Sequence, residues 1–209
     1  MTLALGLLLA YLAGSFPTAW LAGRTKGVDL GAVGSGNYGA TNVLRNLGWV
    51  PAVAVIAVDV GKGFLPVHFF PGWFPADGLS DVAYQVLLAV AAVLGHVHSV
   101  FLRFRGGKGV ATAAGAFLAL APAALLAAAL VWAILVAWRR IVSLASLAGA
   151  LVLLVAVWAA HGREAGSWPL LLVTTLLAAF VFWTHRENIG RLRRGEEKRI
   201  TAGHGGRGG

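Results

Sequence analysis

Long stretches without any charged residue constrain the fold of this chain more than any other feature. They cover residues 2–22, 82–102, 109–138 and 141–160. A helix needs about 20 apolar residues to cross the hydrocarbon core of a bilayer, whereas a membrane barrel would show short segments of alternating polarity. Of the 209 residues, 58% are hydrophobic and only 12% are charged. The sequence therefore predicts an all-α integral membrane protein.

The apolar segments predict about seven transmembrane helices in a single domain, residues 1–200, followed by a flexible Gly-rich tail, 201–209. The first segment has no basic stretch before it and no convincing cleavage site, which favours a retained span over a signal peptide. The segment 109–138 is long for one helix, and Pro122 predicts two short helices in its place. The predicted spans are 2–22, 49–66, 82–102, 109–121, 123–138, 143–160 and 168–184.

The basic residues are distributed asymmetrically over this topology. Every Lys and Arg except Lys62 and Arg163 falls in alternate loops or in the C-terminal tail. By the positive-inside rule, that side is predicted to be cytoplasmic, with the N-terminus outside and the C-terminus cytoplasmic in a cell inner membrane. Because orientation alone explains the net charge of +9, we expect no nucleic-acid partner.

The most polar stretch between spans is residues 33–45, VGSGNYGATNVLR. Glycines allow backbone N–H groups to close on an oxyanion, Ser and Asn add uncharged donors, and Arg45 adds a planar cation suited to phosphate. A simple glycine-rich turn is the alternative reading. The stretch also matches the dinucleotide pattern GxGxxG, but that pattern requires a preceding strand, and a membrane span precedes it here. The composition predicts a phosphate-ester site at the membrane edge.

Two further polar clusters fall on the same predicted side. Residues 105–112 place Lys108 among glycines at a helix start, where free N–H groups favour an anion, although the spacing is not that of an NTPase loop. In 185–191, His185 and Asn188 are three positions apart and can share one helical face. A transporter would more plausibly place ionisable groups near the middle of the membrane. The convergence of three clusters at one edge favours an enzyme.

Other polar residues allow more than one interpretation. A structural hydrogen bond and a catalytic role are equally compatible with His96, and Ser143 could cap a helix or contact a phosphate. Asp59 and Lys62, three apart inside an apolar segment, predict a mutual ion pair. The chain has no cysteine and no carboxylate cluster at this edge, so we expect neither a metal nor another cofactor.

With these motifs in place, the chain resembles the PlsY family of bacterial acyl-phosphate-dependent glycerol-3-phosphate acyltransferases. Its matching segments are 34–45 (GSGNYGATNVLR), 95–112 with the run FRGGKGVAT, and 185–189 (HRENI). Two departures are visible: Ser99 stands where the family usually has proline, and Gly31 where a basic residue is common. The resemblance implies transfer of a fatty acyl group from acyl phosphate to the 1-hydroxyl of glycerol 3-phosphate, giving lysophosphatidic acid and phosphate.

The resemblance also implies roles for individual residues. We expect Ser35, Lys108 and His185 to be catalytic. The predicted substrate-binding residues are Gly34, Gly36, Asn37, Thr41, Asn42, Arg45, His96, Gly106, Gly107, Ser143 and Asn188. The expected partners are acyl phosphate, glycerol 3-phosphate, membrane lipids and, as the family suggests, a soluble enzyme that produces acyl phosphate. A transporter for a phosphorylated metabolite is the alternative function.

Overall fold

A computed structural model describes residues 1–200 of the chain, and these residues form helices joined by loops, the longest of which is residues 25–39. The predicted tail at 201–209 lies outside the described residues. The helices are α1 (Thr2–Ser15), α2 (Thr18–Arg24), α3 (Ala40–Leu47), α4 (Trp49–Trp73), α5 (Asp81–Val97), the 3₁₀ helix η1 (Val100–Leu102), α6 (Val110–Leu120), α7 (Pro122–Arg139), α8 (Val142–His161), α9 (Trp168–Thr184) and α10 (Arg186–Arg193).

Five segments of the described chain are long and apolar enough to cross a membrane. They are Thr2–Arg24, Trp49–Trp73, Asp81–Leu102, Pro122–Arg139 and Val142–His161. Helix α9 with α10 makes a sixth if this pair, bent by 59°, counts as one span, and α6 is a shorter apolar helix. The all-helical membrane fold is therefore confirmed.

Two predicted boundaries illustrate how proline acts in this fold. The predicted break within 109–138 is confirmed, because α6 ends at Leu120 and α7 begins at Pro122. The predicted end of the second span at residue 66 is wrong, because α4 continues through Pro66 and Pro71 to Trp73. Proline is tolerated inside membrane helices where neighbouring groups compensate for the lost hydrogen bond. Pro122 therefore marks a helix boundary, whereas Pro66 lies inside a continuous helix.

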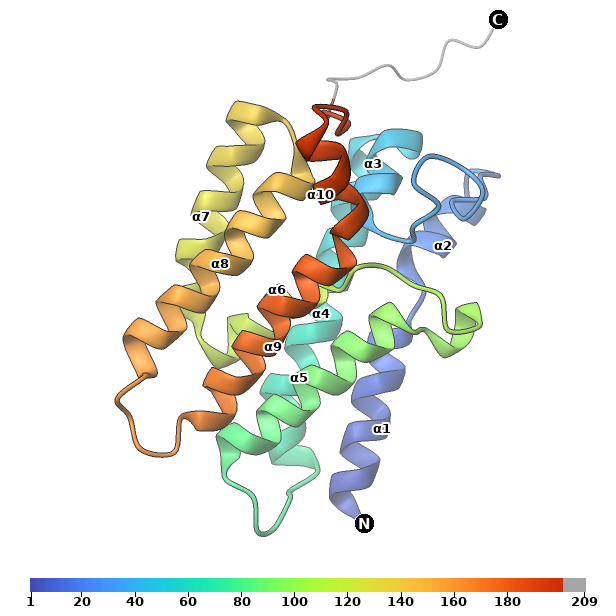
Figure 1. Cartoon of the computed structure of the whole chain (residues 1–209). Helices are drawn as coiled ribbons and strands as arrows, with labels where there is room; N and C mark the ends of the chain where they lie inside the picture. Colours follow the sequence, from blue (N-terminus) through green and yellow to red (C-terminus); the bar gives the residue numbers. More distant parts are fainter. Residues whose placement is uncertain (201–209) are drawn as a thin grey trace, which may run out of the picture.

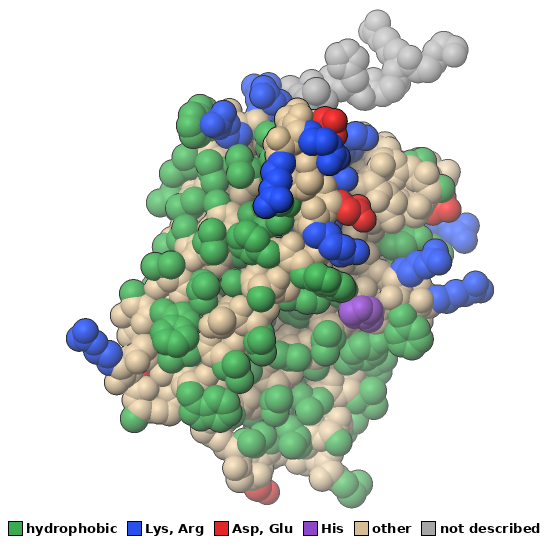
Figure 2. All heavy atoms as spheres, in the orientation of Figure 1, with side chains coloured by type: hydrophobic (Ala, Val, Ile, Leu, Met, Phe, Trp, Pro, Cys, Tyr) green, Lys and Arg blue, Asp and Glu red, His purple; other side chains and the backbone are tan. Residues whose placement is uncertain are grey.

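Neighbouring spans run in opposite directions (Figure 1). The N-terminus and the loops that follow α4 and α8 lie at one end of the bundle, whereas α2, α3 and α10 lie at the other. Figure 2 shows that Lys and Arg side chains gather mainly at the end that carries α10. This distribution agrees with the predicted asymmetry of charge, and the assignment of that end to the cytoplasm stays a prediction.

Arginine side chains at this basic end lie over tryptophan rings. Arg24 lies 5.0 Å from the ring centroid of Trp20, and Arg139 lies 4.3 Å from that of Trp138. Trp183 and Arg186 form a third pair at 5.0 Å. Tryptophan favours the membrane–water interface, where a cation can remain hydrated while it contacts the ring. The three pairs are consistent with a membrane boundary at this end of the bundle.

Glycine allows the central helices to cross at very short range. A Cβ atom added at Gly63 of α4 would lie 1.9 Å from the carbonyl oxygen of Thr112, and one added at Gly115 of α6 would lie 1.9 Å from that of Val60. Close approach of small residues is a principal source of helix association in membranes. This crossing holds the start of α6, which begins two residues after Lys108, against α4.

We predict that Gly63→Ala destabilises the protein, because the added methyl group would overlap the backbone of α6. Overpacking of this kind costs about 1–3 kcal/mol. Gly61→Ala is the matched control, since a Cβ atom at Gly61 meets no atom within 4 Å. Thermal unfolding of the purified protein in detergent measures the effect. Equal melting temperatures for Gly63→Ala and Gly61→Ala would contradict the proposed tight crossing.

Candidate active site

The first polar loop is shaped by Asn42 at the start of α3. Its carboxamide oxygen accepts hydrogen bonds from the backbone N–H of Ser35 at 3.1 Å and from Asn46 at 3.0 Å. Its amide nitrogen donates to the carbonyl oxygens of Leu30 and Val33 at 3.0 and 3.2 Å. Because both ends of this buried amide are bound within the protein, Asn42 organises the loop, and its predicted contact with a substrate stays a prediction.

Two glycines give this loop its course. Gly34 and Gly36 have φ angles of +65° and +64°, a region that residues with side chains rarely adopt. A Cβ atom at Gly34 would also lie 2.2 Å from the side-chain oxygen of Asn42. The turn leaves Ser35 exposed at its tip, with Asn37 and Thr41 partly buried beside it. The loop therefore presents polar side chains to a ligand at the membrane edge.

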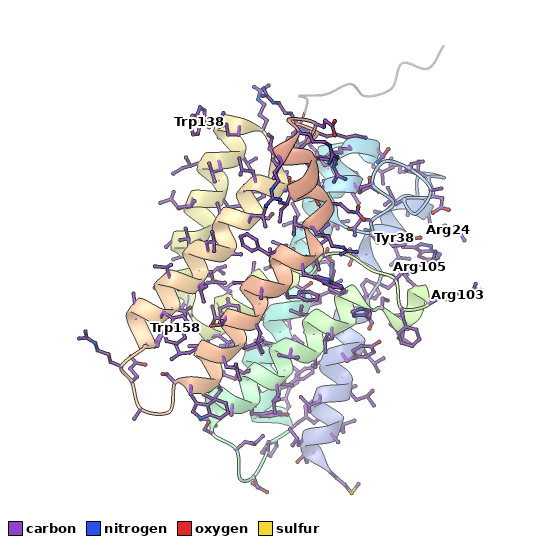
Figure 3. All side chains as sticks on the ribbon, viewed as in Figure 1. Arg24, Tyr38, Arg103, Arg105, Trp138 and Trp158 are labelled. Atoms are coloured by element: carbon purple, nitrogen blue, oxygen red, sulfur yellow. The ribbon has the colours of Figure 1, made fainter. Side chains whose placement is uncertain are left out.

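The second polar loop packs directly onto the end of α5. The N–H of Gly107 donates to the carbonyl oxygen of His96 at 3.2 Å. A Cβ atom at Gly106 would lie 2.0 Å from that oxygen, and one at Gly107 would lie 2.1 Å from His96 Nε2. Only glycine fits at these two positions. Arg103 and Arg105, in contrast, are exposed and point away from the bundle (Figure 3).

Lys108 and Asn188, far apart in the sequence, meet at the centre of the site. The ammonium group of Lys108 donates to the side-chain oxygen of Asn188 on α10. Just before α10, the Nδ1 atom of the buried His185 lies 2.8 Å from the carbonyl oxygen of Val181. A carbonyl can only accept, so Nδ1 carries the hydrogen and Nε2 keeps a lone pair. The structure thus brings the second and third polar clusters together.

A carboxylate that the sequence did not single out joins this cluster. The Oε1 atom of Glu197 accepts hydrogen bonds from Ser143 at 2.9 Å and from the amide nitrogen of Asn188 at 2.6 Å. Its Oε2 atom accepts from Arg191 Nε at 2.7 Å. The hydroxyl hydrogen of Ser143 is directed at Glu197, and the predicted contact of Ser143 with a phosphate stays a prediction. The available signal was a lone acidic pair, Glu196 and Glu197, within a basic segment.

The segment that carries Glu197 also reaches the first cluster. Arg45 of α3 donates to the carbonyl oxygen of Lys198 at 3.1 Å, and the N–H of Ile200 donates to the carbonyl oxygen of Arg140 at 2.7 Å. The buried Nε atom of Arg45 makes no hydrogen bond within the described residues. A partly buried guanidinium with an unused donor is suited to bind an anion.

Burial and neighbouring charge set the ionisation of this site. Burial lowers the pKa of Lys108 to about 8, although the negative charge of Glu197 opposes this effect. Burial tends to raise the pKa of Glu197, but hydrogen bonds from Asn188, Arg191 and Ser143 outweigh it and keep that pKa below its usual value. Near pH 7, Lys108 is therefore largely protonated and Glu197 is ionised.

A small cleft lies beside this cluster. It is lined by Tyr38 from the first polar loop and by Gly106 and Gly107 from the second. His96, Asp59 and Lys62 also line the cleft. The predicted ion pair of Asp59 with Lys62 is confirmed, with 2.9 Å between Lys62 Nζ and Asp59 Oδ1. Across residues 1–200, no group of three or more His, Asp or Glu could hold a metal ion. Metal-independent catalysis stays a prediction.

The geometry of the site defines a class of protein. A helical membrane bundle holds Arg45, Lys108 and Arg191 at one end, around a carboxylate and next to polar loops. Such a concentration of fixed positive charge and hydrogen-bond donors at a helix-bundle edge is typical of a membrane protein that handles phosphorylated ligands.

Comparison with known proteins identifies the family. The family model for glycerol-3-phosphate acyltransferase matches residues 4–195. A glycerol-3-phosphate acyltransferase of Thermus thermophilus is 50% identical over 196 residues and 93% of each chain, and one from Anaeromyxobacter sp. is 44% identical over 200 residues, 94% of this chain and 97% of that relative. The chain belongs to the glycerol-3-phosphate acyltransferase family and is an enzyme of that class.

Solved structures of a relative have the same fold. Crystal structures of PlsY, an integral membrane glycerol 3-phosphate acyltransferase, match at 36% identity in both a glycerol 3-phosphate form and a lysophosphatidic acid form. The TM-scores are 0.86 and 0.83, with 96% and 95% of each chain covered. The similarity extends over nearly the whole membrane domain.

We predict that Glu197→Gln lowers the pKa of Lys108 below about 8, because the negative charge that contributes most to stabilising its protonated form is removed. Labelling of Lys108 with trinitrobenzenesulfonate as a function of pH, read by mass spectrometry, measures this shift. Glu196→Gln is the matched control, since Glu196 is exposed and pairs with Arg194. A labelling midpoint for Lys108 that is the same in both variants would contradict the assigned electrostatics.

Proposed function

We propose that this acyltransferase takes its acyl group from an acyl phosphate and transfers it to the 1-hydroxyl of glycerol 3-phosphate. The hydroxyl oxygen bonds to the acyl carbon, the bond from that carbon to the phosphate oxygen breaks, and the hydroxyl proton leaves. The products are lysophosphatidic acid and inorganic phosphate. The observation that carries the proposal is the joining of Arg45, Lys108, Asn188 and Glu197 into one network in a chain of this family.

Two phosphorylated substrates must come close together for this reaction. Their charges repel each other, and this repulsion must be offset by fixed positive charge that is already in position. Arg45 and Lys108 provide that charge, and the polar loop around Ser35 provides neutral donors. An acyl phosphate is already activated, so direct attack by the hydroxyl requires no covalent acyl-enzyme.

We assign the two substrates to different parts of the network. Ser35, Asn37 and the neighbouring backbone N–H groups, together with Lys108, hold the acyl phosphate and the charge that develops on it. The unused donor of Arg45 binds the phosphate of glycerol 3-phosphate. Ser143 and Asn188 position this substrate indirectly, because both bind Glu197.

His185 is the proposed proton acceptor. Its Nδ1 hydrogen is directed at the carbonyl oxygen of Val181, which leaves Nε2 free to accept a proton from the substrate hydroxyl. A phosphate oxygen of the substrate is the alternative acceptor.

The basic end of the bundle, which carries this site, is proposed to face the cytoplasm, where a soluble enzyme would supply acyl phosphate.

The proposed reaction is tested with purified protein in detergent, given palmitoyl phosphate with and without glycerol 3-phosphate. We expect phosphate release that depends on glycerol 3-phosphate, with lysophosphatidic acid identified by mass spectrometry.

Lys108→Ala should lower kcat/KM by about 10²- to 10³-fold, because charge stabilisation in the transition state is lost. In the unmodified protein, kcat/KM should fall as pH rises through about 8, where Lys108 of the free enzyme loses its proton.

Lys26→Ala is the control for that experiment, because Lys26 is exposed in a loop away from the network. Near-normal turnover by folded Lys108→Ala protein would overturn the role of this lysine. Flux of an unmodified phosphorylated solute across sealed vesicles, without turnover, would instead support a transporter.

We predict that His185→Gln lowers kcat by at least about 10²-fold with little change in KM, because the proton acceptor is removed while the size of the side chain is similar. Steady-state kinetics of folded variant protein provide the measurement. Full activity of His185→Gln would assign proton acceptance to a substrate phosphate oxygen instead.

A further inference from the structure

Three ionisable side chains inside the bundle have no part in the reaction described above. Asp59 and Lys62 of α4 and His96 of α5 are 2%, 8% and 6% exposed. Charged groups are costly at such positions, and they persist where they have partners or a function. Their contacts connect α4 to the break in the first span and to the loop that carries Lys108.

The first of these contacts is at the break between α1 and α2. Lys62 Nζ lies 2.9 Å from Asp59 Oδ1 and donates a hydrogen bond to the carbonyl oxygen of Phe16 at 3.1 Å. Phe16 lies between α1 and α2, directly before Pro17. The same carbonyl oxygen also accepts a hydrogen bond from the backbone N–H of Thr18 at 3.0 Å, so the ammonium group is a second donor to it. The ion pair thereby joins α4 to the bend in the first span.

The second set of contacts runs from Asp59 to the loop that carries Lys108. Asp59 Oδ1 lies 3.9 Å from His96 Nδ1, an atom that makes no hydrogen bond within the described chain. On the other side of the ring, Nε2 faces Gly107, where even a methyl group would not fit. The backbone of His96 holds the same loop through its carbonyl oxygen and the N–H of Gly107. The ring thus lies between a buried carboxylate and the residue next to Lys108.

We propose that Asp59, Lys62 and His96 are positioning residues for acyl transfer. The ion pair fixes the position of Asp59, and its carboxylate orients the ring of His96. The ring in turn fixes the position of the Gly106–Gly107 backbone, and this backbone determines where Lys108 lies. This proposal rests on the catalytic role assigned to Lys108. A structural ion pair alone would hold α4 to the first span and would have no effect on turnover by folded protein.

The test compares the double variant Asp59→Asn/Lys62→Met with His96→Gln. The double variant removes both charges together, which avoids an unpaired buried charge. In both variants we expect kcat per folded protein to fall about 10- to 100-fold, since misplacement by about 1 Å can have this effect. The KM for glycerol 3-phosphate should stay within about threefold, and the rate at which trinitrobenzenesulfonate labels Lys108 relative to Lys26 should change.

His98→Gln is the matched control, because His98 is exposed just after α5 and should leave kcat unchanged. A lower melting temperature with normal kcat per folded protein in the two test variants would overturn the proposal and leave a structural pair. If Lys108→Ala remains active, the role of Lys108 fails instead, so the two failures are distinguishable.

A steric test applies even if the double variant does not fold. Gly107→Ala should lower kcat because its methyl group would overlap His96 Nε2. In Gly107→Ala/His96→Ser, the smaller serine side chain leaves room for the added methyl group. The fold reduction of kcat in this double variant should therefore be at least about fivefold smaller than the product of the fold reductions in Gly107→Ala and His96→Ser. Independent, multiplicative losses would show that the ring does not set the position of the loop.

Discussion

The carboxylate of Glu197 is the interaction on which the candidate active site depends. It accepts hydrogen bonds from α8 through Ser143 and from α10 through Asn188 and Arg191, and its negative charge favours the protonated form of Lys108. Without such a carboxylate, Arg45, Lys108 and Arg191 would repel one another in a partly buried site. One acidic side chain thus allows the concentration of positive charge that the two phosphorylated substrates of the proposed reaction would require.

Breaks in the helices explain why a polar site can form in such an apolar molecule. Within a bilayer, backbone groups must be paired inside the protein, and irregular backbone is tolerated only where protein or an aqueous edge satisfies it. The first span breaks at Phe16 and Pro17, and the last bends at His185. At the first break Lys62 adds a second donor to the carbonyl oxygen of Phe16, and at the second the ring of His185 binds the carbonyl oxygen of Val181 in the preceding helix. The second break carries His185 of the proposed active site, and Lys62 links the first break to Asp59.

Much of the architecture followed from patterns of a few residues. Runs without charge predicted an all-helical membrane protein, and Pro122 predicted the break between α6 and α7. The i, i+3 spacing of Asp59 and Lys62 predicted their ion pair. The extension of α4 beyond Pro66 was not predictable in this way, because a local signal for a helix end was overridden by packing against α6. Local sequence also could not show that both the oxygen and the nitrogen of the Asn42 side chain make hydrogen bonds within the preceding loop.

The sequence by itself determined the membrane-helical class, the asymmetry of charge and the three polar clusters, because hydrophobic length, net charge and residue type are local properties. Only the tertiary structure decided which of these groups meet. Contacts of Lys108 with Asn188, of Glu197 with Ser143 and of His96 with Gly107 join segments separated along the chain. Their formation depends on helix crossings and on the path of the C-terminal segment, and no local pattern encodes a distance between two helices.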